Sequence, residues 1–143
     1  MSGINTNRWL AGGLVAALLI WLLEGAGSVL YMDDMQASLT ALGLSIEMDA
    51  RMWAISVLVS LISGLVLIFF YAAARPRFGP GPKTAMIVAC AFWLGGYLIS
   101  LIGLYMIGMY EVGLLTKWAV VGLVEMNIAA LVGGWIYREP VGT

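Results

Sequence analysis

Four apolar runs, each long enough to cross a lipid bilayer, take up most of this chain of 143 residues. They cover about residues 9–30, 52–71, 84–107 and 114–137. A bilayer core needs roughly 20 apolar residues per helix, and continuous rather than alternating apolar runs favour helices over a closed β-barrel. The chain is 62% hydrophobic and 10% charged, whereas an average soluble domain has roughly 25% charged residues. We therefore predict an all-α integral membrane four-helix bundle, forming a single transmembrane domain over residues 1–143.

The basic residues predict how this bundle is oriented. The uninterrupted apolar stretch of the first run, up to Glu24, is longer than the apolar region of a signal peptide and has no A-x-A site, so we expect it to be retained as a helix. With the N-terminus inside, only Arg51 and Lys117 fall on the outer side. The other five basic residues fall on the inner side: Arg8, Arg75, Arg77, Lys83 and Arg138. The positive-inside rule therefore predicts that both termini are cytoplasmic.

Acidic residues divide in the opposite way. Five of them fall in the outer loops: Asp33, Asp34, Glu47, Asp49 and Glu111. They would give the outer mouth a negative field that favours cations, although solvated loop acids that only aid solubility are an equally good interpretation.

The first outer loop, from Met32 to Arg51, is long enough to hold structure of its own. Asp33 and Gln36 form a capping-box pattern at its start, and Gly43 is a natural helix stop. Apolar residues at helical spacing lie between them: Met35, Leu39 and Leu42. We predict a short amphipathic helix on the outer surface, which either covers the bundle or rests in the lipid headgroups.

Several kinds of chemistry lack their usual residues. The chain has no histidine and one cysteine, Cys90, which removes haem axial ligation, histidine-based metal sites and C-x-x-C redox chemistry. No P-loop, G-x-S-x-G or dinucleotide fingerprint is present. A net charge of -1 disfavours a nucleic-acid partner. We therefore expect no enzyme activity, no cofactor and no nucleic acid, with the lipid bilayer as the main surroundings.

Two acidic residues, Glu24 and Glu125, lie inside the apolar runs. An acid within a membrane is costly unless it is paired, protonated or in a wet cavity, and it therefore indicates a functional site. At ~1.5 Å of rise per residue, both acids lie ~10 Å below the outer surface. The same count places Ser60 of the second run and Ser100 of the third at this depth. We predict a polar layer to which each helix contributes one group.

Small residues accompany both acids at helical spacing, which is typical of faces where another helix approaches. On the first run these are Gly13, Ala17, Gly27 and Ser28, and on the last run Gly122, Ala129 and Gly133. One side of the third run carries Trp93, Gly96, Tyr97, Ser100 and Gly103. We expect both glutamates to face protein rather than lipid, with Tyr97 beside them. Serine hydroxyls often bond their own helix backbone, so simple packing is the alternative for Ser60 and Ser100.

Two carboxylates at one level cannot both ionise cheaply in a low dielectric. The pair would either share a proton or hold a cation between them, and a divalent ion would need further oxygen ligands from Ser60, Ser100 or water. Whether a metal binds is left open. The structural alternative is a pair of protonated acids that hydrogen-bond adjacent helices and only hold the bundle together.

Between the second and third runs lies a basic turn with the sequence R-P-R-F-G-P-G-P-K-T, in which Pro76, Pro80 and Pro82 are expected to end the helix. This turn, the G-G-L-V-A start, Glu24 with Gly25, and the closing G-G-W-I-Y-R-E resemble a bacterial family of small four-span inner-membrane proteins of uncharacterised function. The resemblance covers most of the chain. It implies a bacterial inner-membrane location and gives no indication of an activity.

These observations favour a small inner-membrane binding or transport protein with an outward-facing polar pocket. The residues expected at the site are Glu24, Glu125, Ser60, Ser100 and Tyr97. We expect it to bind a proton or a small cationic or amphipathic solute. The alternative is a non-catalytic accessory or assembly subunit of a larger membrane complex, in which the acids are structural.

A bundle of this size can hardly provide alternating access alone, so a homodimer is the expected extension. The candidate interfaces are the small residues Gly95, Gly96 and Gly103, or the face that carries Asn127.

Overall fold

The computed structural model describes residues 4–138, which fold into helices joined by short connections and contain no strand. In chain order the elements are α1 (Thr6–Gly27), the 3-10 turn η1 (Ser28–Leu30), α2 (Met32–Ala41), α3 (Ala50–Phe78), α4 (Pro82–Phe92), the π-helical segment η2 (Trp93–Leu98), α5 (Ile99–Met106) and α6 (Val112–Ile136).

Four segments of this part of the chain are long and apolar enough to cross a membrane: Thr6–Leu30, Ala50–Phe78, Pro82–Met106 and Val112–Ile136. They confirm the predicted all-α class and the four predicted spans. Most of their outward-facing side chains are large and apolar, among them Leu14, Val57 and Trp135, as lipid-exposed surfaces require. The chain is a multi-pass membrane protein.

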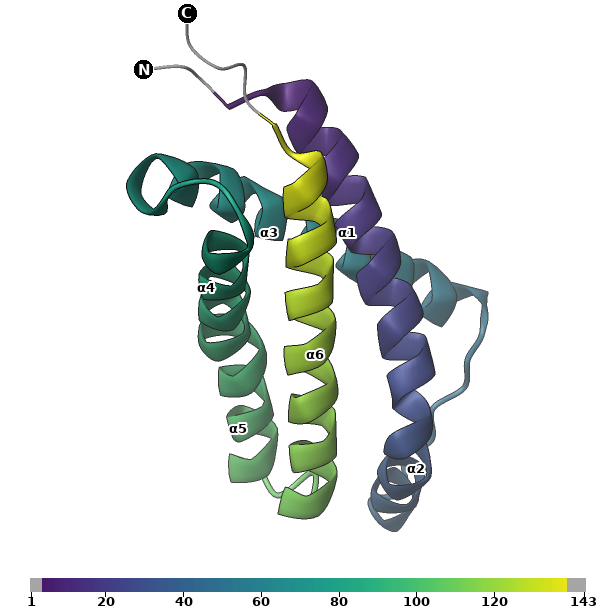
Figure 1. Ribbon diagram of the computed structural model, residues 1–143. Coiled ribbons are helices and arrows are strands. Elements are labelled where there is room, and N and C mark those ends of the chain that lie inside the picture. Colours follow the sequence, from purple (N-terminus) through teal and green to yellow (C-terminus); the bar gives the residue numbers. More distant parts are fainter. Residues whose placement is uncertain (1–3, 139–143) are drawn as a thin grey trace, which may run out of the picture.

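The bundle places the start of α1, the α3–α4 turn and the end of α6 at one end, and α2 with the α5–α6 connection at the other (Figure 1). We call these the terminal end and the α2 end. In this view α6 runs between α1 and the column formed by α4 and α5, while α3 passes obliquely behind α1 and α6 (Figure 1). Helices far apart in sequence, α1 and α6, are therefore neighbours.

Helix α1 uses two different faces for its two neighbours. Towards α3, a Cβ added to Gly64 would lie 2.3 Å from the backbone nitrogen of Ala17. Towards α6, a Cβ added to Gly12 would lie 2.5 Å from the carbonyl oxygen of Gly133. Because glycine allows backbones to approach this closely, the small residues determine where the helices cross. The single small-residue stripe predicted on the first run is therefore wrong, since Gly13 and Ala17 contact α3 whereas Gly27 packs against Val121 of α6.

The turn at the terminal end differs from the prediction at Pro76. Helix α3 continues through this proline to Phe78 and ends at Gly79, whose φ of 83° stops it. Pro76 removes one backbone hydrogen bond, and because only two residues of the helix follow it, the distortion that it causes is confined to the last turn. Pro82 begins α4, where its fixed φ suits the first helical turn. Thr84 fixes the connection by donating to the carbonyl oxygen of Gly79 at 2.7 Å.

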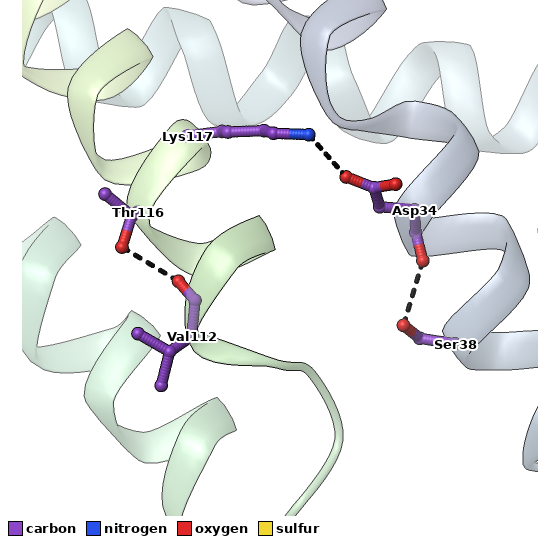
Figure 2. A network of polar contacts seen from close by, with 5 residues as sticks. All are labelled: Asp34, Ser38, Val112, Thr116 and Lys117. Carbon is purple, nitrogen blue, oxygen red and sulfur yellow. Dashed lines mark hydrogen bonds and ion pairs between the residues drawn. The ribbon is translucent and has the colours of Figure 1, made fainter.

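At the opposite end, α2 begins one residue after its N-cap Tyr31 and carries Asp33 and Asp34 in its first turn. The predicted capping box is therefore wrong, because Asp33 is already inside the helix and Tyr31 makes no side-chain capping bond. Lys117 of α6 donates to Oδ2 of Asp34 at 2.6 Å, while the Asp34 carbonyl accepts from Ser38 (Figure 2). This ion pair joins α2 to α6.

Candidate functional site

The carboxyl group of Glu24, near the α2 end of α1, is the centre of a cluster of hydrogen-bond donors. Its Oε1 accepts from the hydroxyl of Tyr31 and from the indole Nε1 of Trp118, the latter at 3.1 Å. Its Oε2 accepts from the hydroxyl of Tyr97 at 3.2 Å. The donors come from three separate segments, the end of η1, α6 and η2, and together they compensate this carboxyl for lost hydration.

Tyr31 and Trp118 also pack on one another. Their rings stack with centroids 5.3 Å apart, and the ring of Tyr110 meets Trp118 edge-on at 6.2 Å. Burial, together with the neighbouring Glu24, raises the pKa of Tyr31 above its ordinary value, so its hydroxyl stays protonated and can donate. Tyr31 and Trp118 therefore pack over Glu24 and also donate hydrogen bonds to it.

Glu125 of α6 lies beside Glu24, and its carboxyl group is within hydrogen-bonding reach of the Glu24 carboxyl. Only 2% of Glu125 is exposed. Within residues 4–138 no N–H or O–H donor reaches its Oε2. The two acids thus have different environments. Tyr31, Tyr97 and Trp118 donate hydrogen bonds to Glu24, whereas the polar group next to Glu125 is the carboxyl group of Glu24.

Buried apolar side chains pack next to both members of the pair. Leu101 and Leu115 pack with Tyr31 in one buried cluster, and Met126 follows Glu125 in another. Two cavities, of about 380 Å³ at the terminal end and about 340 Å³ at the α2 end, have neither glutamate in their linings. No group of three or more potential metal-binding histidine, cysteine or acidic side chains converges anywhere in residues 4–138.

The segment η2 explains why Tyr97 reaches the site and Ser100 does not. A π-helical turn holds one residue more than an α-helical turn, so it rotates everything that follows by roughly 100° relative to a regular helix. Tyr97 faces α6, where its ring occupies the space that a side chain at Gly122 would need. Beyond η2, Leu101 is buried instead of Ser100.

Ser100 and Ser60 are therefore not part of the hydrogen-bonded cluster, contrary to the predicted polar layer. The hydroxyl of Ser100 is exposed and donates to the carbonyl oxygen of Gly96 on its own helix at 2.7 Å. Ser60 is buried, but it belongs to α3, which crosses α1 next to Gly13 and Ala17, about two helical turns before Glu24. The structure brings together three of the five predicted residues: Glu24, Glu125 and Tyr97.

Tyr31 and Trp118 are not among the residues predicted for the site, although their spacing from the two acids contains a signal. Tyr31 follows Glu24 by seven residues, and Trp118 precedes Glu125 by the same interval. Seven residues are close to two helical turns, so each aromatic residue shares a helix face with an acid.

Comparison of the chain with protein-family models, with curated protein sequences and with solved structures gave no match. The proposals below therefore rest on the geometry of the chain itself.

Proposed function

We propose that this protein binds a small cationic solute in exchange for one proton that the Glu24–Glu125 pair holds within the membrane. The observation that carries the proposal is the contact between two carboxyl groups of which only Glu24 is surrounded by donors. Two carboxyl oxygens in contact repel unless a proton or a cation lies between them.

The donor pattern favours a proton over a divalent metal ion in the resting pair. Tyr31, Tyr97 and Trp118 present hydrogens to Glu24, which suit an anionic acceptor and would repel a cation at the same oxygens. A Ca²⁺ or Mg²⁺ ion would take six or more oxygen ligands. The serines that were expected to supply such ligands do not hydrogen-bond either carboxyl.

In the resting state Glu125 is protonated and its O–H donates a hydrogen bond to the ionised Glu24, so that the pair has a net charge of -1. An incoming monovalent cation that displaces the proton leaves the charge of the site unchanged. Exchange therefore avoids placing additional charge in the low dielectric, where an unpaired charge is costly. This charge balance supports coupling between solute and proton.

We further propose that the α2 end faces the outside of a bacterial inner membrane and that both termini are cytoplasmic. The distribution of the basic residues supports this orientation, with Arg75 and Arg77 at the terminal end. Helix α2, with Met35 and Leu39 buried and Asp33 exposed, would then lie over the outer mouth of the bundle.

Proteoliposomes that contain a pH-sensitive dye test this function. Tetraethylammonium added to one side should drive proton movement in the opposite direction with the wild-type protein and not with the Glu24→Gln, Glu125→Gln double variant. Glu47→Gln, a change at an exposed acid, is the matched control and should retain the flux. Equal flux from the wild type and the double variant would exclude the carboxyl pair from transport and would favour the alternative of a structural pair in an accessory subunit.

A further inference from the structure

The cavity at the α2 end is formed where α2, the end of α5 and the α5–α6 connection meet. It has a volume of about 340 Å³, and its lining comprises Ser38, Ala41, Leu42, Tyr105, Gly108, Met109, Tyr110 and Glu111. Aromatic rings, aliphatic groups and a thioether thus accompany a single acidic residue. This cavity is separate from the carboxyl pair, which does not contribute to its lining.

The acidic residue of this cavity, Glu111, can interact with a ligand through its side chain. Glu111 is the N-cap residue of α6, but its side chain makes no capping hydrogen bond. Its exposed carboxylate forms no ion pair or hydrogen bond within the described part of the chain, whereas Asp34 nearby is paired with Lys117 (Figure 2). Glu111 therefore carries a negative charge that no cation of the described protein neutralises.

We infer that this cavity is a binding site for a small organic cation, such as an alkylammonium group. Tyr105 and Tyr110 contribute aromatic rings, which attract ammonium groups, Leu42 and Met109 offer contacts for alkyl groups, and Glu111 supplies the opposite charge. A strongly hydrated inorganic ion would gain little from the apolar lining. This inference rests on the proposed function, because the cavity would be the site at which the transported solute first binds and its lining would determine the class of that solute.

Two aromatic rings connect this cavity to the carboxyl pair. Tyr110 lines the cavity and meets the ring of Trp118, which in turn donates its indole hydrogen to Glu24. A cation held at Glu111 is therefore separated from Glu24 by Tyr110 and Trp118. Movement of these rings would open a route from the outer cavity to the proton.

Isothermal titration of the purified full-length protein with tetraethylammonium, in nanodiscs of uncharged phosphatidylcholine, tests the site directly. Glu111→Gln should weaken binding at least about tenfold, as expected for the loss of a charge-assisted contact. Tyr105→Leu, at a residue 54% exposed and therefore safe for folding, should weaken it about 3- to 30-fold. The matched control Glu47→Gln should bind as the wild type does.

Two results would overturn the inference: unchanged binding in Glu111→Gln, or sodium competing as effectively as tetraethylammonium, which would indicate a purely electrostatic attraction. The Glu24→Gln, Glu125→Gln double variant separates this inference from the proposed function. Tetraethylammonium that still binds this variant in a Glu111-dependent way, without proton flux in the wild type, would support the cavity and contradict the exchange mechanism. Proton flux without Glu111-dependent binding would contradict the cavity alone.

Discussion

The indole of Trp118 donates a hydrogen bond of 3.1 Å to Glu24, so that α6 supplies both a donor to the partly buried acid of α1 and the second acid beside it. The hydrogen bond therefore joins α1 and α6, the first and last helices of the chain, at the position of the two acids. It also gives Glu24 and Glu125 different environments, from which separate effects of mutation follow.

Replacing Glu24 should cost more stability than replacing Glu125. Glu24→Gln puts an amide NH₂ among groups that are themselves donors, which should lower the free energy of unfolding by about 1–3 kcal/mol. Glu125→Gln retains a donor towards Glu24 and should change stability by less than about 1 kcal/mol. Reversible unfolding in mixed micelles measures both, and equal losses would contradict the assignment of donors to Glu24.

Trp118→Phe should lower the free energy of unfolding by about 1–3 kcal/mol, because it removes one donor to Glu24 while keeping an aromatic ring against Tyr31. Trp135→Phe is the matched control, since Trp135 is 71% exposed. That change should stay within about 0.5 kcal/mol of the wild type. The same unfolding assay compares the two variants, and a loss of similar size in both would indicate that the indole hydrogen bond is not needed.

Gly122→Ala should displace Tyr97 from the site. The added Cβ would lie 2.4 Å from the Tyr97 ring, so the ring must move, at a cost of about 1–3 kcal/mol. Gly113→Ala in the same helix meets open space and should be neutral or stabilising by up to about 1 kcal/mol. Thermal unfolding of the two alanine variants provides the comparison, and a neutral Gly122→Ala would show that the contact with Tyr97 is not tight.

Deleting Gly95 should convert the π-helical turn of η2 into a regular α-helical turn and rotate α5 relative to α4. A nitroxide attached at Ser100→Cys, in a Cys90→Ser background, should be accessible to oxygen dissolved in the bilayer when η2 is intact, and one at Leu101→Cys should not be. In the deletion variant this difference should diminish or reverse. Electron paramagnetic resonance reports the accessibility, and an unchanged pattern would mean that η2 does not set the rotation of α5.

The Asp34–Lys117 ion pair should contribute little to overall stability. Both side chains are about half exposed, at 52% and 50%, and such pairs are typically worth less than about 1 kcal/mol. A double-mutant cycle of Asp34→Asn and Lys117→Met measures the coupling, which should fall further at high salt. A coupling well above this value would mean that the pair is shielded from water and holds α2 in place.

The sequence by itself determined the membrane class, the four spans and the presence of two acids at a common depth. These properties depend on composition, on run length and on the fixed rise of an α-helix, all of which are local. Helix ends were nearly as predictable, except at Pro76, through which α3 continues, and at Asp33, which lies inside α2 instead of capping it.

Only the tertiary structure decided which side chains meet at that depth. Glu24 and Tyr97 meet because η2 turns Tyr97 towards α6 and the end of α1, whereas α3 crosses α1 near Ala17 and Ser100 lies exposed beyond η2. Contact across helices depends on the rotation of each helix about its axis, and a single extra residue in one turn changes that rotation by roughly 100°. Apolar composition, which determined the spans so clearly, contains no information about that angle.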